Sequence, residues 1–310
     1  MTSVNNKTLV VIGSLNVDLV MRTDRIPKAG ETFYGNSFST GCGGKGANQA
    51  IACARLSSQE NVKMIGCVGD DEFGSKLIEN LKRESIDTSE VIVQQDISTG
   101  VALIMVEEVS GQNRICLSKG ANGTFQPSIL TKHASSIEEA AMVIMQLEVP
   151  LETVTQAVAL AKASNVPVLL NPAPARELPV EMYSSIDYIV PNETEAEILT
   201  GIKLESIDDA KKAGLKLLEW GVKRAVVITM GAIGVVLVTK TESLLLDPVQ
   251  VDRVIDTTGA GDCFIGGMAT KLVEGVSLVD AINFGQHASS IAITRHGAQE
   301  SIPYRVEIEA

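Results

Sequence analysis

The sequence has no long hydrophobic run. Nowhere do about 18 apolar residues follow one another, the length that a membrane-spanning helix needs. The N-terminal stretch MTSVNNKTLVVIG also lacks the charged and then apolar regions of a signal peptide. These absences argue against both membrane insertion and export, so we expect a cytoplasmic protein.

Clusters of Lys and Arg are also missing. The 310 residues include 26 Lys and Arg against 38 Asp and Glu, which gives a net charge of -12. Proteins that bind nucleic acids draw much of their affinity from clustered basic side chains, so no nucleic-acid partner is expected. An acidic chain repels anionic ligands at long range. A bound phosphate would therefore have to be held locally, by backbone amides and a metal ion.

Cysteine and histidine are too few and too scattered for a disulfide framework or a His-based metal site. The cysteines are five in number, which is odd, and show no C-x-x-C spacing; the three histidines, His133, His287 and His296, are scattered. We therefore expect reduced thiols, as in a cytosolic protein, at Cys42, Cys53, Cys67, Cys116 and Cys263.

Short apolar runs alternate with segments of helical period along most of the chain. This alternation is typical of an α/β fold, a mostly parallel central sheet with helices on both faces. At this length, and with 45% hydrophobic residues, we expect one α/β domain over residues 1–310. The expected strands are 9–13, 62–67, 142–146, 166–171, 188–191 and 225–229, and the expected helices are 47–56, 73–83, 151–163, 193–200, 208–220, 261–274 and 278–293.

Two regions, about 15–42 and 98–118, break this rhythm. They hold alternating segments such as LNVDLVMRT and TGVALIMVEE, joined by Gly, Pro, Asn and Gln. Such segments predict short antiparallel strands rather than βαβ units. We expect them to form a small, discontinuous β-sheet lid over the mouth of the main domain.

The segment DTTGAGD, residues 256–262, is the most informative for chemistry. Small residues at Gly259, Ala260 and Gly261 precede an apolar helical stretch, where free backbone amides and the helix dipole favour an anion such as phosphate. Asp262 in the first turn would lie beside that anion, a place suited to a base that takes a proton from an attacking hydroxyl. The alternative is a tight turn in which Asp262 only caps the helix.

A second glycine-rich segment, GCGGKGAN, covers residues 41–48. It fails the P-loop pattern G-x-x-x-x-G-K-[ST], because Ser39 and Gly46 stand where Gly and Ser or Thr are required. Lys45 and Asn48 offer donors and an acceptor suited to the hydroxyl groups of a polyol, while the glycines allow close backbone approach. A simple flexible turn explains the same residues.

Polar side chains also follow several of the predicted strands. Asn16 and Asp18 come just after the first strand and point to the same side, and Glu148 follows strand 142–146, at the sheet edge where α/β proteins bind ligands. Asn192 and Glu195 open a helix, where a capping box is the simpler interpretation. The stretch 229–234, TMGAIG, predicts either a hairpin or a loop at the edge of a nucleotide site.

Taken in order, these segments resemble the ribokinase and PfkB carbohydrate kinase family. GSLNVD, GGKGANQA, MQLE, NPAPARELP, PNETEAE, TMGAIG, DTTGAGD and TRHGAQESIP all match, and the resemblance spans nearly the whole chain. It implies a ribokinase-like α/β domain with a small β-sheet lid, a homodimer formed through the lid, and transfer of phosphate from ATP to the 5-hydroxyl of D-ribose, with Mg²⁺ and a K⁺ activator.

The resemblance also implies a role for each matching residue. Asp262 would be the general base, with Gly259, Ala260 and Gly261 as the anion hole. The sugar would be bound by Asn16, Asp18, Gly44, Lys45, Gly46, Ala47, Asn48, Glu148 and Asp262. The nucleotide would be bound by Asn192, Thr229, Met230, Gly231, Ala232, Ile233, Gly234, Gly261, Asp262 and Gln286. Mg²⁺ would approach Glu195 through water, and K⁺ would bind near Asp256, Thr258, Ala292, Arg295, Gly297 and Ser301.

Other functions remain open at this point. A relative in the same family could act on deoxyribose, fructose or a nucleoside, and a non-catalytic sugar sensor could keep the fold. A dinucleotide-dependent oxidoreductase is disfavoured, because the one G-x-G-x-x-G match, at Gly41, Gly43 and Gly46, does not follow a buried strand.

Overall fold

The computed structural model describes residues 8–58, 61–110 and 112–309 and contains two β-sheets. The larger sheet has nine strands, parallel except at one edge, where β11 to β13 pair antiparallel. Its order is β13 (Ser243–Leu246), β12 (Val235–Val238), β11 (Ala225–Thr229), β10 (Tyr188–Ile189), β9 (Val168–Leu170), β8 (Met142–Met145), β1 (Leu9–Ile12), β4 (Val62–Gly69) and β5 (Asp87–Gln94). The α/β prediction with a mostly parallel sheet is therefore confirmed.

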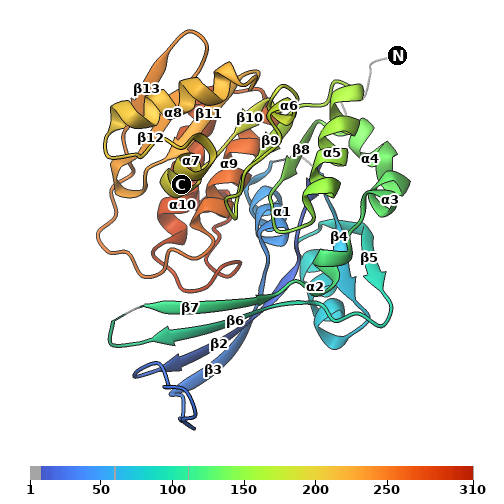
Figure 1. Ribbon diagram of the computed structural model, residues 1–310, viewed down its shortest axis with the longest axis vertical. Coiled ribbons are helices and arrows are strands. Elements are labelled where there is room, and N and C mark those ends of the chain that lie inside the picture. The colour runs from blue at the N-terminus through green and yellow to red at the C-terminus, as the bar shows by residue number, and fades with distance from the viewer. Residues whose placement is uncertain (1–7, 59–60, 111, 310) are drawn as a thin grey trace.

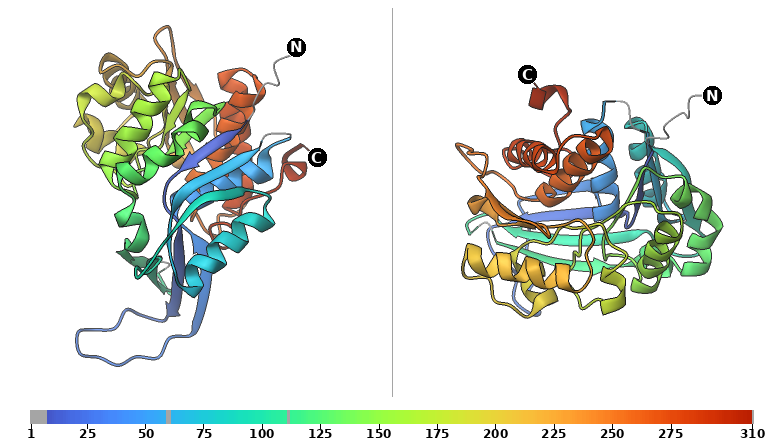
Figure 2. Two further views of the ribbon diagram at one scale, coloured as in Figure 1. Left: turned by 90° about the vertical axis from the view of Figure 1, so that its right-hand side faces the viewer. Right: turned by 90° about the horizontal axis from the view of Figure 1, so that it is seen from above.

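Helices cover both faces of this sheet (Figures 1 and 2). On one face lie α1 (Lys45–Leu56), α2 (Glu72–Arg83), α9 (Ala260–Glu274) and α10 (Leu278–Ala292). On the other face lie α4 (Ala134–Glu138), α5 (Leu151–Ala163), α7 (Glu193–Thr200) and α8 (Ile207–Glu219). Shorter helices are α3 (Pro127–Leu130), α6 (Val180–Tyr183) and α11 (Val306–Glu309).

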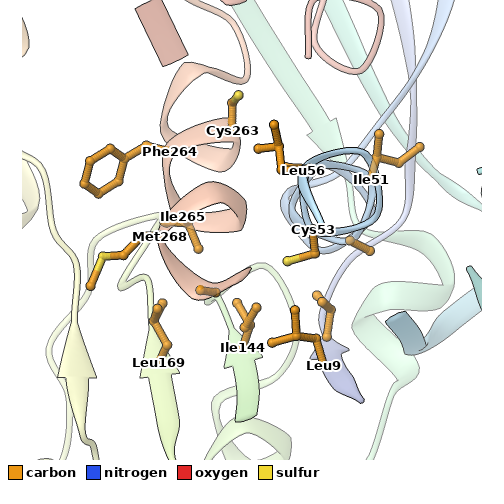
Figure 3. Packing of buried hydrophobic residues seen from close by; sticks show 14 of the residues in the cluster. Leu9, Ile51, Cys53, Leu56, Ile144, Leu169, Cys263, Phe264, Ile265 and Met268 are labelled. Carbon is orange, nitrogen blue, oxygen red and sulfur yellow. The ribbon is translucent and has the colours of Figure 1, made fainter. Parts of the chain in front are cut away.

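The apolar strands alternate between two buried clusters. In β1, Leu9 and Val11 belong to the cluster that includes side chains of α1 and α9, whereas Val10 and Ile12 belong to the cluster that includes side chains of α5 and α8. Successive side chains of a strand point to opposite faces, so a strand covered on both faces has to be apolar throughout. Figure 3 shows the first cluster, in which side chains of α9 and α1 lie over Leu9, Ile144 and Leu169.

The smaller sheet has four strands and projects from one end of the body (Figure 1). Its order is β3 (Ser37–Gly43), β2 (Asn16–Thr23), β6 (Gly100–Glu107) and β7 (Asn113–Ser118). The two regions set apart in the sequence do supply these strands. The expectation of antiparallel pairing was wrong for the central pair, because β2 and β6 run parallel, while each pairs antiparallel with its outer neighbour. Turn residues predict how neighbouring strands pair, but they carry no information on the pairing of two segments about 80 residues apart.

Three strands of the large sheet were not expected. β5 begins with the polar residues DTSE and lies at an edge, so it lacks the buried apolar run that marked the other strands. β12 and β13 extend the opposite edge. The hairpin interpretation of 229–234 is confirmed, since β11 pairs antiparallel with β12 across the short turn Gly231–Ile233.

The five cysteines are free thiols, as expected, and only Cys116 is exposed. In residues 8–58, 61–110 and 112–309, every helix is too short or too polar to cross a bilayer.

Candidate active site

A tight glycine turn starts α9 and leaves two amides available to a ligand. Gly259 precedes the helix with a φ of 75°, and a Cβ there would lie 3.1 Å from the backbone of Ala298. The amide of Ala260 donates to the Thr257 carbonyl (3.2 Å), whereas the amides of Gly261 and Asp262 have no protein acceptor within the described parts of the chain. Free amides at the N-terminus of a 15-residue helix form an anion site.

The carboxylate of Asp262 is held on both oxygens by side-chain amides from α1. Gln49 Nε2 donates to Oδ1 and Asn48 Nδ2 donates to Oδ2, each at 2.9 Å. Asp262 is 6% exposed and lines a cavity of about 190 Å³. The same cavity is lined by Lys45, Asn192, Glu195, Thr229, Thr257, Gly259 and Gly261. Side chains predicted from four separate motifs therefore meet at one place.

The glycines before α1 allow the chain to pack against itself. Gly44 has a φ of 88°, and a Cβ there would lie 2.7 Å from the amide nitrogen of Asn16. A Cβ on Gly46 would lie 2.6 Å from the amide nitrogen of Ser14, whose carbonyl accepts from Ala47 N (3.0 Å). The turn is thus tightly packed and not a loose loop, and its glycines are required by the neighbouring backbone.

Lys45 begins α1 among three acids. Burial alone would lower the pKa of its ammonium group, but the charges of Asp262, Glu148 and Glu195 outweigh burial and raise this pKa. Glu148 Oε2 accepts hydrogen bonds from the Lys45 amide (3.0 Å) and from the Ser14 hydroxyl. Lys45 is therefore a fixed positive charge at the cavity.

Asn16 and Asp18 lie on β2, at the root of the small sheet. Asn16 Oδ1 accepts from Asn122 Nδ2 (2.8 Å), which fixes the direction of the Asn16 amide. Burial, and then the negative charges of Glu148, Glu300 and Asp262, raise the pKa of Asp18 to about 7. Asp18 also lines a cleft of about 450 Å³ beneath the small sheet, between that sheet and the loops around Asp256 and Gly297.

Asn192 and Glu195 form the capping box that the sequence predicted. Glu195 Oε2 accepts from the Asn192 amide and Asn192 Oδ1 accepts from the Glu195 amide, both at 2.8 Å. Burial raises the pKa of the Glu195 carboxyl group. Because both residues also line the cavity with Asp262, the structural role does not exclude a second role toward a ligand.

The remaining nucleotide candidates are spread out. Thr229 lines the cavity at the end of β11, and Met230, Gly231, Ala232, Ile233 and Gly234 form the turn beyond it. Gln286 lies in α10, where its Nε2 donates to Asn283 Oδ1 (3.4 Å), and it is not among the residues of the described chain that line the cavity.

Asp256 joins the loop before α9 to the loop after α10. Its Oδ1 accepts from the amide (2.9 Å) and hydroxyl (2.6 Å) of Thr258, and its Oδ2 accepts from the Gly297 amide (3.1 Å). Burial raises the pKa of Asp256, but these hydrogen bonds outweigh burial and lower it. Ala292 is buried at the end of α10, Arg295 pairs with Glu307, and the Ser301 hydroxyl donates to the Ala298 carbonyl (2.8 Å).

Several residues of the site were missed by the sequence analysis. Gln49 follows Asn48 directly in the motif GGKGANQA and contacts Asp262, but a buried glutamine gives no signal of its own. Asn122 and Asn171 lie within GANGT and NPAP, and neither of them was assigned a role from the sequence. Glu300 follows Gln299 in the late motif and lies near Asp18.

The chain is similar to known proteins over nearly its whole length. The model of the pfkB family carbohydrate kinases matches residues 6–305. The chain is 44% identical to a ribokinase of Schizosaccharomyces pombe, over 97% of this chain and 96% of that protein. It is 39% identical to a deoxyribokinase of Salmonella typhi, over 95% of each.

A solved structure is also similar over nearly the whole chain. It is that of Arabidopsis thaliana ribokinase complexed with ribose and ATP, with a TM-score of 0.91, 32% identity, and coverage of 98% of this chain and 97% of that one. The chain therefore belongs to the pfkB family of carbohydrate kinases.

Proposed function

We propose that this chain is an ATP-dependent kinase of D-ribose that phosphorylates the 5-hydroxyl, giving ribose 5-phosphate and ADP. The observation that carries the proposal is that the Asp262 carboxylate and the free amides of Gly261 and Asp262 lie at one helix N-terminus. A base beside an anion-binding terminus is what phosphoryl transfer to a hydroxyl requires. The ribokinase relatives, one of them solved with ribose and ATP, support the choice of both substrates.

In the proposed reaction, the 5-hydroxyl oxygen attacks the γ-phosphorus of ATP in line. The new P–O bond forms as the bond to the β,γ-bridging oxygen breaks, ADP leaves, and the hydroxyl proton passes to Asp262. Gly259, Ala260 and Gly261 act as the anion hole: the amide of Gly261 stabilises the transferring phosphoryl group, and the Ala260 amide closes the turn. Lys45 adds a positive charge to the same cavity.

The sugar is proposed to lie between the loop after β1 and the start of α1. Asp18 and Glu148 would accept hydrogen bonds from sugar hydroxyls, and Asn16 would donate one, because its Oδ1 already accepts from Asn122. The small sheet would close over the sugar as a lid, excluding water and limiting hydrolysis of ATP. The proposed sugar contacts are Asn16, Asp18, Gly44, Lys45, Gly46, Ala47, Asn48, Glu148 and Asp262.

The nucleotide is proposed to bind against Asn192, the turn from Thr229 to Gly234, and the stretch near Gln286. Within residues 8–58, 61–110 and 112–309, no three His, Cys, Asp or Glu side chains form a metal cage. One buried carboxylate at the cavity, Glu195, fits Mg²⁺, because this ion usually keeps several waters and binds through one or two carboxylates together with substrate phosphates. Mg²⁺ would neutralise charge on the transferring group.

A monovalent cation is proposed to bind near Asp256, Thr258, Ala292, Arg295, Gly297 and Ser301. The ionised carboxylate of Asp256 and the close packing of Gly259 against Ala298 make this junction suited to a cation that orders the anion-hole loop. Such a cation would act by preorganisation and would not touch the substrates. K⁺ should therefore raise kcat.

A homodimer through the small sheet is part of the proposal. Phe38, Leu103, Ile115 and Leu117 lie on this sheet and are 58%, 48%, 55% and 55% exposed. The strand register puts Phe38 and Leu103 on one face of the sheet, whereas Ile115 and Leu117 point to the other face, toward the cleft beneath it. Exposed apolar side chains on one face are typical of interaction surfaces, so the proposed contact is the face of Phe38 and Leu103. Sedimentation velocity at micromolar concentration would give a dimer, and a monomer would contradict this part of the proposal.

The first test is ADP production by the purified protein with ATP and Mg²⁺, on ribose, deoxyribose, fructose and adenosine, each with and without K⁺. Preference for ribose with stimulation by K⁺ supports the sugar and the cation site. Activity on another acceptor would keep the mechanism and overturn the sugar assignment. Binding of ribose without turnover of any acceptor would favour a sugar sensor.

A further inference from the structure

A run of buried amides leads to one oxygen of Asp262. Gln146 Nε2 donates to Gln49 Oε1 (2.6 Å), and Gln49 Nε2 donates in turn to Asp262 Oδ1 (2.9 Å). Gln146 and Gln49 are both 0% exposed. In both hydrogen bonds of this run the donor lies on the side away from the carboxylate and the acceptor on the side toward it, so the run ends in a donor to Asp262.

The direction of the Gln49 amide is fixed by its surroundings. Asn171 Nδ2 donates to the Val190 carbonyl (3.0 Å), and a carbonyl can only accept. The Oδ1 atom of Asn171 therefore faces Gln49 and accepts from its Nε2 (3.2 Å). Both amide hydrogens of Gln49 are thus directed at acceptors, Asn171 and Asp262.

The buried side chain of Gln146 destabilises the folded state. Its Oε1 is buried without a hydrogen-bond partner in the described residues, which disfavours the folded state. Gly13 makes room for this amide, since a Cβ there would lie 2.0 Å from Gln146 Oε1. A buried amide with an unpaired oxygen is poorly explained by stability, whereas its bond to Gln49 gives it a role toward Asp262.

We propose that Gln49 is the positioning residue of Asp262, an inference that rests on the proposed role of Asp262 as the base. Its amide holds Oδ1 and stabilises the ionised carboxylate, so that the remaining lone pairs face the cavity and the acceptor hydroxyl. Gln49 is fully buried and is not among the residues of the described chain that line the cavity with Asp262. Gln146 holds the Gln49 side chain through its hydrogen bond to Gln49 Oε1.

The test is Gln49→Met, which keeps the length of the side chain and removes the amide. Loss of a hydrogen bond to a charged group predicts a fall in kcat of about tenfold or more, and a shift of the acid limb of the kcat profile by about one pH unit upward. The KM for ribose should change less than about threefold, because Gln49 does not contact the sugar. Thr270→Val is the matched control, since it removes a buried hydrogen bond of α9 to Gly266 (2.8 Å).

Wild-type kcat and an unmoved acid limb in folded Gln49→Met would overturn the proposal, as would an equal loss in Thr270→Val. If Gln49→Met does not fold, Gln146→Leu decides: about threefold lower kcat with the same upward shift supports the proposal, and no change overturns it. Asp262→Asn is measured beside them. If it retains turnover, the proposed function fails together with this inference; if it is inactive while Gln49→Met is normal, only the inference fails.

Discussion

Binding of ribose should depend on the protonation of Asp18, and the direction follows from its surroundings. Burial and the charges of Glu148, Glu300 and Asp262 raise the pKa of Asp18 to about 7 in the ligand-free protein. An ionised carboxylate accepts stronger hydrogen bonds from sugar hydroxyls than a protonated carboxyl group, which keeps only part of its acceptor capacity. We therefore expect ribose to bind the ionised form, so that below pH 7 Asp18 loses a proton as the sugar binds and the affinity falls as the pH falls.

The size of this effect can be worked out from that pKa. With a pKa of about 7 in the free protein, the dissociation constant rises by a factor of 1 + 10^(7−pH), which is about tenfold between pH 8 and pH 6. At pH 6 about 0.9 proton should be released for each ribose bound. Above pH 8 the affinity should be constant.

Titration calorimetry of ribose in two buffers of different ionisation enthalpy measures both quantities. Glu300→Gln is a useful variant, because it removes one of the charges that raise the pKa of Asp18 and should move the pH dependence to lower pH. Asp18→Asn should bind weakly and without pH dependence. A dissociation constant that is equal at pH 6 and pH 8, with no proton released, would refute the reasoning.

Three further substitutions follow from the same contacts. Gly259→Ala should lower kcat by about tenfold, because the φ of 75° and the 3.1 Å approach to Ala298 strain the anion-hole turn; steady-state kinetics checks this, and an unchanged kcat would contradict it. Gly44→Ala should destabilise the fold by roughly 1–3 kcal/mol in urea unfolding, since its Cβ would meet Asn16 N at 2.7 Å, and wild-type stability would show that the turn relaxes. Asp18→Asn should raise the Tm at pH 8. The pKa of Asp18 is higher in the folded state than in the unfolded state, so the free energy of unfolding falls as the pH rises from about 4 to 7, and an amide, which does not ionise, avoids this loss of stability. A lower Tm of the variant at pH 8 would count against the raised pKa.

The place of Asp262 at a helix start could be predicted from the sequence because local signals converge there. Glycines at 259 and 261 before an apolar helix predict a turn and a helix start, and Asp262 then falls in the first turn whatever the rest of the fold does. The strand β1 could likewise be predicted, because a strand buried on both faces has to be apolar throughout.

The partners of Asp262 could not be predicted in the same way. Gln49 lies 213 residues away in the chain, and the direction of its amide depends on Asn171 and the Val190 carbonyl, which only the folded sheet brings together. The raised pKa of Asp18 depends in the same way on acids from three other segments. The edge strand β5 was missed because a half-exposed strand carries no apolar run.

The turnover of Asp262→Asn tests the central claim most directly. The account predicts that kcat with ribose and ATP falls by about 10² or more, while ribose still binds the variant with an affinity within about threefold of wild type by calorimetry. A variant that turns over ribose at a rate near that of the wild type would contradict the assignment of Asp262 as the base.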